Sequence, residues 1–86
     1  MAEQGQTVVR VLAVIRRVIP GTEHVGVTDK LVNSVIDSIG VFEVVTALEK
    51  EFDVTFGDND LTMQNFENSV ALAALMDRLR AARGAL

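Results

Sequence analysis

The sequence predicts an all-α fold with three longer helices and one short helix between the second and the last. Apolar residues recur at helical spacing in three separate segments, and turn-forming or capping residues lie between them. The 86 residues include no cysteine, are 49% hydrophobic and only 5% aromatic, so a single small aliphatic core must hold the chain together. We therefore expect one domain over residues 1–86, with an ordered core from about residue 7 to residue 80 and flexible ends.

The first helix is expected over residues 7–19, with Thr7 as its N-cap. Its inward stripe consists of Val8, Val11, Leu12, Ile15, Val18 and Ile19, and the opposite side carries Arg10, Arg16 and Arg17. Pro20 and Gly21 end this helix, since proline cannot continue it. Residues 21–37 show no sustained period, and an irregular connection of this length is often functional.

The second helix is expected over residues 38–52, with Asp37 or Ser38 as its N-cap. Its inward stripe consists of Val41, Val44, Val45, Leu48 and Phe52, with Ala47 allowing the close approach of a neighbour. The opposite flank carries Ile39, Phe42, Glu43, Thr46 and Glu49. Exposed apolar side chains among acids are typical of a small docking surface, where apolar contact gives affinity and charge steers the partner. The alternative is that Phe42 belongs to the core.

Negative charge is concentrated in one part of the chain. Residues 37–60 hold seven acidic residues against the single Lys50, a net charge of −6, whereas the whole chain has −4. Such a field repels nucleic acid and attracts basic protein surfaces. The simpler interpretation is a solvated helix face, but the concentration in one segment favours a partner surface.

The C-terminal part is expected to form a loop, a short helix and a long helix. Phe56 anchors the loop of residues 53–60, and Asp60 caps a short helical turn through Leu61, Met63 and Phe66. A last helix begins at Asn68 or Ser69 and is followed by a frayed tail over residues 81–86. This helix places Val70, Leu72, Leu75, Met76 and Leu79 inward and Asp77, Arg78 and Arg80 outward.

Other chemistries fit the sequence poorly. A calcium loop beginning at Asp58 would need glycine and glutamate where the chain has Met63 and Ser69. His24 is the only histidine, which argues against a zinc site. A triad of Ser38, His24 and Asp37 or Asp29 exists in composition only, because a small helical domain offers little room for a pocket or an oxyanion hole.

The chain shows no targeting or membrane signal. Its first seven residues are polar, unlike a signal peptide, and no apolar run approaches the roughly 20 residues of a bilayer span. The basic residues lack interleaved aromatics for nucleic-acid stacking. We expect a soluble, cytoplasmic protein that spans no membrane and binds no nucleic acid.

The run Asp37-Ser38-Ile39-Gly40, with Leu48-Glu49-Lys50-Glu51-Phe52 behind it, resembles the modification site of acyl and peptidyl carrier proteins. The resemblance extends from residue 7 to about residue 79. It implies a four-helix bundle in which Ser38 carries a 4'-phosphopantetheine arm, transferred from coenzyme A by a phosphopantetheinyl transferase. The arm's thiol would hold cargo as a thioester, so the chain itself needs no catalytic residue and no metal and is not an enzyme.

The same resemblance implies a docking surface and its partners. The surface comprises Asp37, Ile39, Phe42, Glu43, Thr46 and Glu49. Its partners would be the transferase and the loading, condensing and tailoring enzymes, each with a basic docking surface, and the carrier itself is expected to be a monomer. The chain departs from the family at Ser34-Val35-Ile36, where Leu-Gly-x is usual, at Ile39, where leucine is usual, and at Lys50, which places a cation among the acids.

Three functions remain open at this point. The first is a free-standing acyl carrier protein for fatty-acid or polyketide-type biosynthesis, which the acidic balance favours. The second is a discrete peptidyl or aminoacyl carrier of a nonribosomal-peptide-type pathway. The third, of another class, is a helical adaptor that never carries an arm, since ordinary helix bundles use similar apolar patterns.

Overall fold

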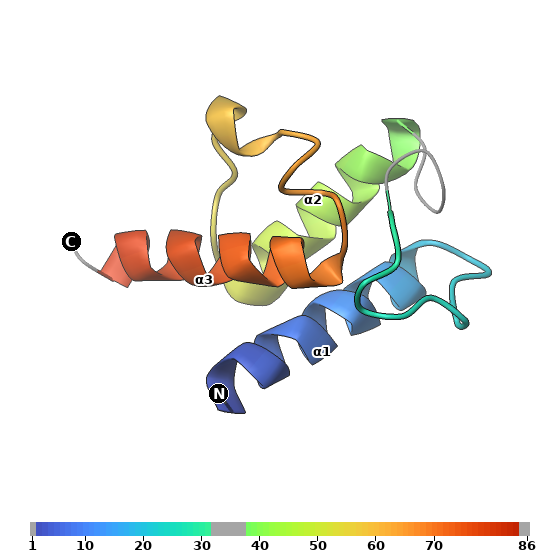
Figure 1. Cartoon of the computed structure of the whole chain (residues 1–86). Coiled ribbons are helices and arrows are strands. Elements are labelled where there is room, and N and C mark those ends of the chain that lie inside the picture. The colour runs from blue at the N-terminus through green and yellow to red at the C-terminus, as the bar shows by residue number, and fades with distance from the viewer. Residues whose placement is uncertain (1, 32–37, 85–86) are drawn as a thin grey trace.

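The computed structural model describes residues 2–31 and 38–84, with the side chains of residues 2–4, 38–39 and 83–84 excepted. In these ranges the chain forms the helices α1 (Ala2–Val18), α2 (Ser38–Phe52) and α3 (Ser69–Gly84), and the 3-10 helix η1 (Asp58–Asp60). α1 packs against both other long helices (Figure 1). The all-α prediction is confirmed, and the described residues include no strand. No helix in this part of the chain combines the length and the apolar character needed to cross a bilayer.

The predicted start of the first helix was wrong. α1 already begins at Ala2, and Thr7 lies inside it with only 3% of its surface exposed. The Thr7 Oγ1 donates a hydrogen bond to Asp77 Oδ1 of α3 at 3.0 Å, so this hydroxyl ties two helices together instead of capping one. Asp77, predicted to point outward, is half-buried for the same reason. The helix ends at Val18, one residue before the predicted end, and the expected chain reversal follows, with Gly21 at a φ of 78° directly after Pro20.

The core is aliphatic and is built from one stripe of each helix. Most of the predicted inward residues are buried or packed against the buried set, and Val14, which the predicted stripe omitted, is buried as well. Val70 was predicted to face inward but is 44% exposed, since it lies in the first turn of α3 beyond the edge of the core. The buried hydrophobic residues are Val11, Leu12, Val14, Ile15, Val25, Leu31, Val44, Leu48, Phe52, Val54, Phe66, Leu72, Ala73, Leu75 and Met76.

The predicted bounds of α2 are confirmed, and a left-handed residue ends the helix. Asp53 has a φ of 55°, and the Val54 amide donates to the Glu49 carbonyl at 3.2 Å, which closes the last turn. The chain then passes to Phe56, whose half-buried ring lies 6.1 Å from the ring of Phe66 between centroids. The expected anchoring of this loop by Phe56 is therefore confirmed.

The predicted short third helix through Leu61, Met63 and Phe66 was wrong, and with it the count of four helices. The described residues between α2 and α3 contain only η1 and a set of turns. Side chains here form hydrogen bonds with backbone groups that would otherwise bond within a helix. Thr62 Oγ1 accepts from the Asn65 backbone N–H at 3.2 Å, and Asn65 Nδ2 donates to the Asp60 carbonyl at 2.9 Å. Such local bonds compete with helix formation.

The start of α3 agrees with the prediction, whereas its end does not. Asn68 is the N-cap, since its Oδ1 accepts a hydrogen bond from the Ala71 amide at 2.9 Å. The helix continues to Gly84, through residues that were expected to belong to a frayed tail.

Two adjacent substitutions at the start of α3 should have different effects on stability. Ser69 is fully buried, and its hydroxyl has no hydrogen-bond partner among the described residues. Ser69→Ala should leave the free energy of unfolding unchanged or raise it by up to about 1 kcal/mol, because it removes an unpaired buried polar group. Asn68→Ala should lower it by about 1 kcal/mol through loss of the cap. Urea unfolding measures both, and a clear loss of stability in Ser69→Ala would show that the hydroxyl has a partner.

Candidate functional site

Ser38 is the first residue of α2, and the segment that leads to it is attached to the start of α3. The Leu31 amide donates to the Glu67 carbonyl at 2.9 Å, and the Val70 amide donates to the Val27 carbonyl at 3.3 Å. Since Leu31 is also fully buried, the chain is held firmly seven residues before Ser38. These two bonds tie the described part of the connection after α1 to the start of α3.

The earlier part of this connection packs its own side chains. Thr22 is buried and its Oγ1 donates to the Ile19 carbonyl at 2.7 Å, while Arg16 donates from Nη2 to the carbonyl of the buried Val25 at 2.9 Å. The Asp29 carboxylate accepts the Gly26 amide at 2.7 Å and so closes a turn. These contacts explain how a long segment without helix or strand keeps a defined path.

Several predicted site residues lie wholly or partly outside the described structure. Asp37 and the departure at Ser34-Val35-Ile36 fall within residues 32–37, which are not described. Ser38 and Ile39 are placed by their helical backbone alone. Their roles as attachment point and docking residues stay predictions.

The solvent-facing side of α2 carries the other predicted docking residues. Phe42 is 69% exposed, so the alternative that it belongs to the core is wrong. Glu43 and Thr46 are exposed as well, and Thr46 Oγ1 donates to the Phe42 carbonyl at 2.9 Å. A large aromatic side chain in solvent beside a free carboxylate is the composition expected of a docking surface.

Glu49 differs from Glu43, although both were expected to be exposed. Glu49 is half-buried, and its Oε2 accepts a hydrogen bond from the Phe56 amide at 2.9 Å. The carboxylate thus holds the loop after α2 against the helix. This tie joins residues seven positions apart across a turn, and helical periodicity gives no signal for it.

A small apolar pocket opens beside the first turns of α2. Val41 lies one turn beyond Ser38 and forms one wall, and the opposite wall comes from the turns before α3. Leu61 and Met63 in that wall are 46% and 61% exposed, so the pocket has an apolar rim. The lining residues are Val41, Leu61, Thr62, Met63 and Phe66.

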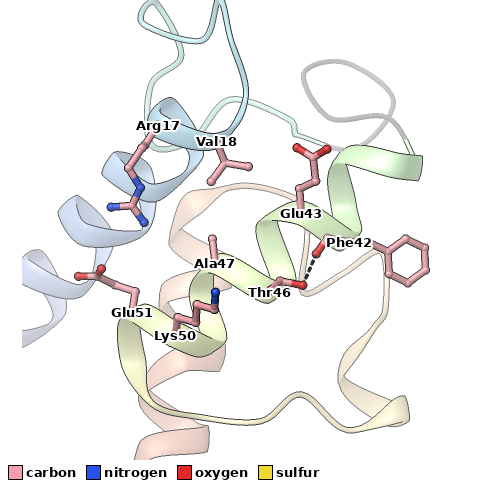
Figure 2. A pocket seen from close by; sticks show the side chains of 8 residues that line it. All are labelled: Arg17, Val18, Phe42, Glu43, Thr46, Ala47, Lys50 and Glu51. Carbon is pink, nitrogen blue, oxygen red and sulfur yellow. Dashed lines mark hydrogen bonds between the residues drawn. The ribbon is translucent and has the colours of Figure 1, made fainter.

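An open groove lies on another side of α2, between this helix and the end of α1 (Figure 2). Val18 and Ala47 form its apolar floor, and Figure 2 shows the Arg17 side chain extending from α1 toward α2, while the Lys50 side chain lies along α2. The lining residues are Arg17, Val18, Phe42, Glu43, Thr46, Ala47, Lys50 and Glu51. Helical periodicity does not indicate this groove, because Arg17 and Lys50 belong to different helices and line one space only when α1 packs on α2.

The charges around the groove are unequally paired. Arg10 forms an ion pair with Glu51 at 3.3 Å, donates to the Glu51 carbonyl at 3.0 Å and stacks over the Phe52 ring at 4.3 Å. Arg17 and Lys50 form no ion pair and no side-chain hydrogen bond with any described residue. The Glu51 end of the groove is therefore neutralised, and two cations remain free.

The described residues contain no group of three or more His, Asp or Glu that could hold a metal ion. Asp60 of η1 stabilises its own turn, because its Oδ2 accepts a hydrogen bond from the Gly57 backbone amide at 2.8 Å.

Comparison with known proteins gives one match. The family model described as "Phosphopantetheine attachment site" matches residues 9–76, which span α1, α2, η1 and the first half of α3. No curated protein matches the chain.

The contrast between the two glutamates is testable. Glu49→Ala should lower the free energy of unfolding by about 1 kcal/mol, because the Phe56 amide loses its acceptor. Glu43→Ala, at an exposed position on the same helix, should change it by less than about 0.5 kcal/mol. Urea unfolding followed by circular dichroism gives both values. Equal values would mean that the Glu49 contact contributes nothing to stability.

Proposed function

The chain belongs to the family of phosphopantetheine attachment domains, which carry 4'-phosphopantetheine covalently, and from this we propose that it is an acyl carrier protein with Ser38 as the attachment residue. The position of Ser38 carries the proposal. It is the first residue of α2, and one side of the next turn exposes Phe42 and Glu43 to solvent. A serine there can be reached by another enzyme.

The start of a helix also suits the product of the modification. The helix dipole is positive at the N-terminal end of α2. A phosphodiester on Ser38 would bring its negative charge to that end, which is favourable. The residues present therefore fit the group, with Ser38 as its point of attachment.

Attachment is a group transfer in which the chain supplies only the acceptor. The Ser38 hydroxyl oxygen forms a bond to the phosphorus next to the pantetheine of coenzyme A, and the bond from that phosphorus to the bridging oxygen of the diphosphate breaks. Adenosine 3',5'-bisphosphate leaves with the electron pair, and the serine proton passes to a base of the transferase. When bound, the arm supplies the thiol for thioester chemistry, a group that this cysteine-free sequence lacks.

The pocket beside α2 supports an acyl cargo over an aminoacyl one. Its walls are apolar, and among the described residues the Thr62 hydroxyl is the only polar side-chain group that lines it. Such a pocket suits a hydrocarbon chain and offers no carboxylate to an ammonium group. We therefore favour carriage of acyl intermediates for fatty-acid or polyketide-type biosynthesis over nonribosomal peptide synthesis.

Partner enzymes are proposed to dock on the exposed side of α2. Phe42 supplies apolar contact and Glu43 supplies a free negative charge close to Ser38. A basic surface on the partner would be steered to this end of the helix. Glu49 contributes less than the sequence suggested, because its carboxylate is already engaged by the Phe56 amide.

Modification at Ser38 can be tested by intact-mass spectrometry. Incubation with coenzyme A and a broad-specificity phosphopantetheinyl transferase should add the mass of one 4'-phosphopantetheine, and Ser38→Ala should abolish the addition. Ser34→Ala is the matched control, since it removes the nearest other serine and should load normally. An unmodified wild-type chain, or loading that survives in Ser38→Ala, would contradict the proposal.

The docking proposal predicts a charge-dependent rate. Glu43→Lys should reduce the kcat/KM of arm transfer by about tenfold at low salt, because an attractive charge becomes repulsive toward a basic partner. Glu67→Lys makes the same change at an exposed position on the segment before α3 and should have little effect. Rates that are equal in both variants and insensitive to salt would exclude Glu43 from the docking surface.

A further inference from the structure

We propose that the groove between α1 and α2 binds the free carboxylate of a carboxylated acyl cargo, with Arg17 and Lys50 as its cationic partners. The inference rests on the proposed function, because the cargo must be tethered at Ser38. It concerns a different side of α2 from the apolar pocket, and a different chemical class of acyl group.

The groove is aligned with the attachment residue. Residues four apart lie on one ridge of a helix, and such a row runs from Ser38 through Phe42 and Thr46 to Lys50. The last three members of this row line the groove. An arm that lies along the row therefore leads from its attachment point to the Lys50 side chain.

The distance along this row matches the length of the arm. Twelve residues of helix separate Ser38 from Lys50, which at the helical rise is about 18 Å. About fifteen bonds join the serine oxygen to the acyl carbon of a loaded arm, and at the spacing of an extended chain they reach about 18 Å. The first carbons of a cargo would then lie beside Lys50 and opposite Arg17.

The charge at this end of the groove selects an anion. Arg17 and Lys50 are exposed and have no ionic partner among the described residues. Glu51, which also lines the groove, is engaged by Arg10 through its carboxylate and its carbonyl. The other acid of the groove, Glu43, lies about two turns nearer to Ser38 and would repel a carboxylate toward the Lys50 end.

The floor of the groove suits a short carbon chain. Val18 and Ala47 are half-buried and offer apolar contact between the two charged ends. A carboxylate beside exposed cations binds weakly when free, but tethering at Ser38 supplies an effective concentration in the millimolar range. The neighbouring pocket of Val41 and Phe66 has no charged side chain and offers nothing to such a group.

The test uses two cargoes of equal carbon number. The wild-type chain is loaded with malonyl or with propionyl phosphopantetheine from the corresponding coenzyme A thioester, and intact mass confirms loading at Ser38. Titration of a 13C-labelled malonyl carboxyl by NMR should give an acid dissociation constant about 1.5- to 5-fold larger than in free malonyl-pantetheine, the range expected of an exposed ion pair. Amide shifts of Val18, Ala47 and Lys50 should differ between the malonyl and the propionyl forms.

Variants assign the effect to the two cations. Arg17→Gln and Lys50→Gln should each reduce the change in the dissociation constant, and the double variant should abolish it together with the difference in amide shifts. Arg78→Gln is the matched control, because it removes an exposed arginine on α3 outside the groove. A salt concentration of about 0.5 M should weaken the effect by screening.

The outcomes separate the two proposals. Failure to load either cargo at Ser38 would overturn the proposed function. Normal loading with a malonyl carboxyl that titrates as it does in free malonyl-pantetheine would overturn the groove inference alone and leave Arg17 and Lys50 for solvent or a partner protein. An effect that persists in the double variant would also overturn it.

Discussion

The arrangement of the site depends on two backbone hydrogen bonds between segments far apart in the sequence. The Leu31 amide binds the Glu67 carbonyl, and the Val70 amide binds the Val27 carbonyl, so the connection after α1 is paired with the start of α3. The amide of the fully buried Leu31 needs such a partner, because an unpaired amide away from water is costly. The pairing holds the chain seven residues before Ser38, and α2, which begins at Ser38, contributes to the groove, the pocket and the docking surface of the proposed carrier function.

Some charged side chains of α2 form contacts within the domain, and others are exposed to solvent. The formal charge of the sequence does not distinguish these two groups. Glu49 accepts the Phe56 amide and Glu51 accepts Arg10, so two acids of this helix already have partners within the domain. Among the described residues, neither Glu43 nor Lys50, near the C-terminal end of α2, forms an ion pair, so both charges are available to an approaching protein. A segment with a net charge of −6 thus presents negative charge at Glu43, near Ser38, and positive charge at Lys50, about three turns of helix from Ser38. This polarity would orient a partner along α2 as well as attract it.

The sequence was sufficient wherever local rules decide the structure. Periodicity and capping residues predicted α2 from end to end, the start of α3 at Asn68 or Ser69, and the chain reversal at Pro20 and Gly21. The errors arose where contacts between distant residues override local rules. Thr7 has the residue type of an N-cap, but its hydroxyl bonds to Asp77 of α3. Residues 61–66 have helical apolar spacing, but the side chains of Thr62 and Asn65 form hydrogen bonds with nearby backbone groups. The groove could not be predicted for the same reason, since Arg17 and Lys50 line one groove only when α1 packs on α2.

The weakness of the groove contact follows from what a carrier must do. A cargo held by a buried ion pair would be removed from water at a high cost and would be slow to leave. Exposed cations such as Arg17 and Lys50 hold a carboxylate by about 1 kcal/mol or less, so tethering keeps it nearby without trapping it. Because Phe42 and Thr46 belong both to the groove and to the exposed side of α2, a protein docking there would cover the groove. Docking and release of the cargo would then be one event: the surface that recruits the enzyme is also the surface from which the cargo is displaced.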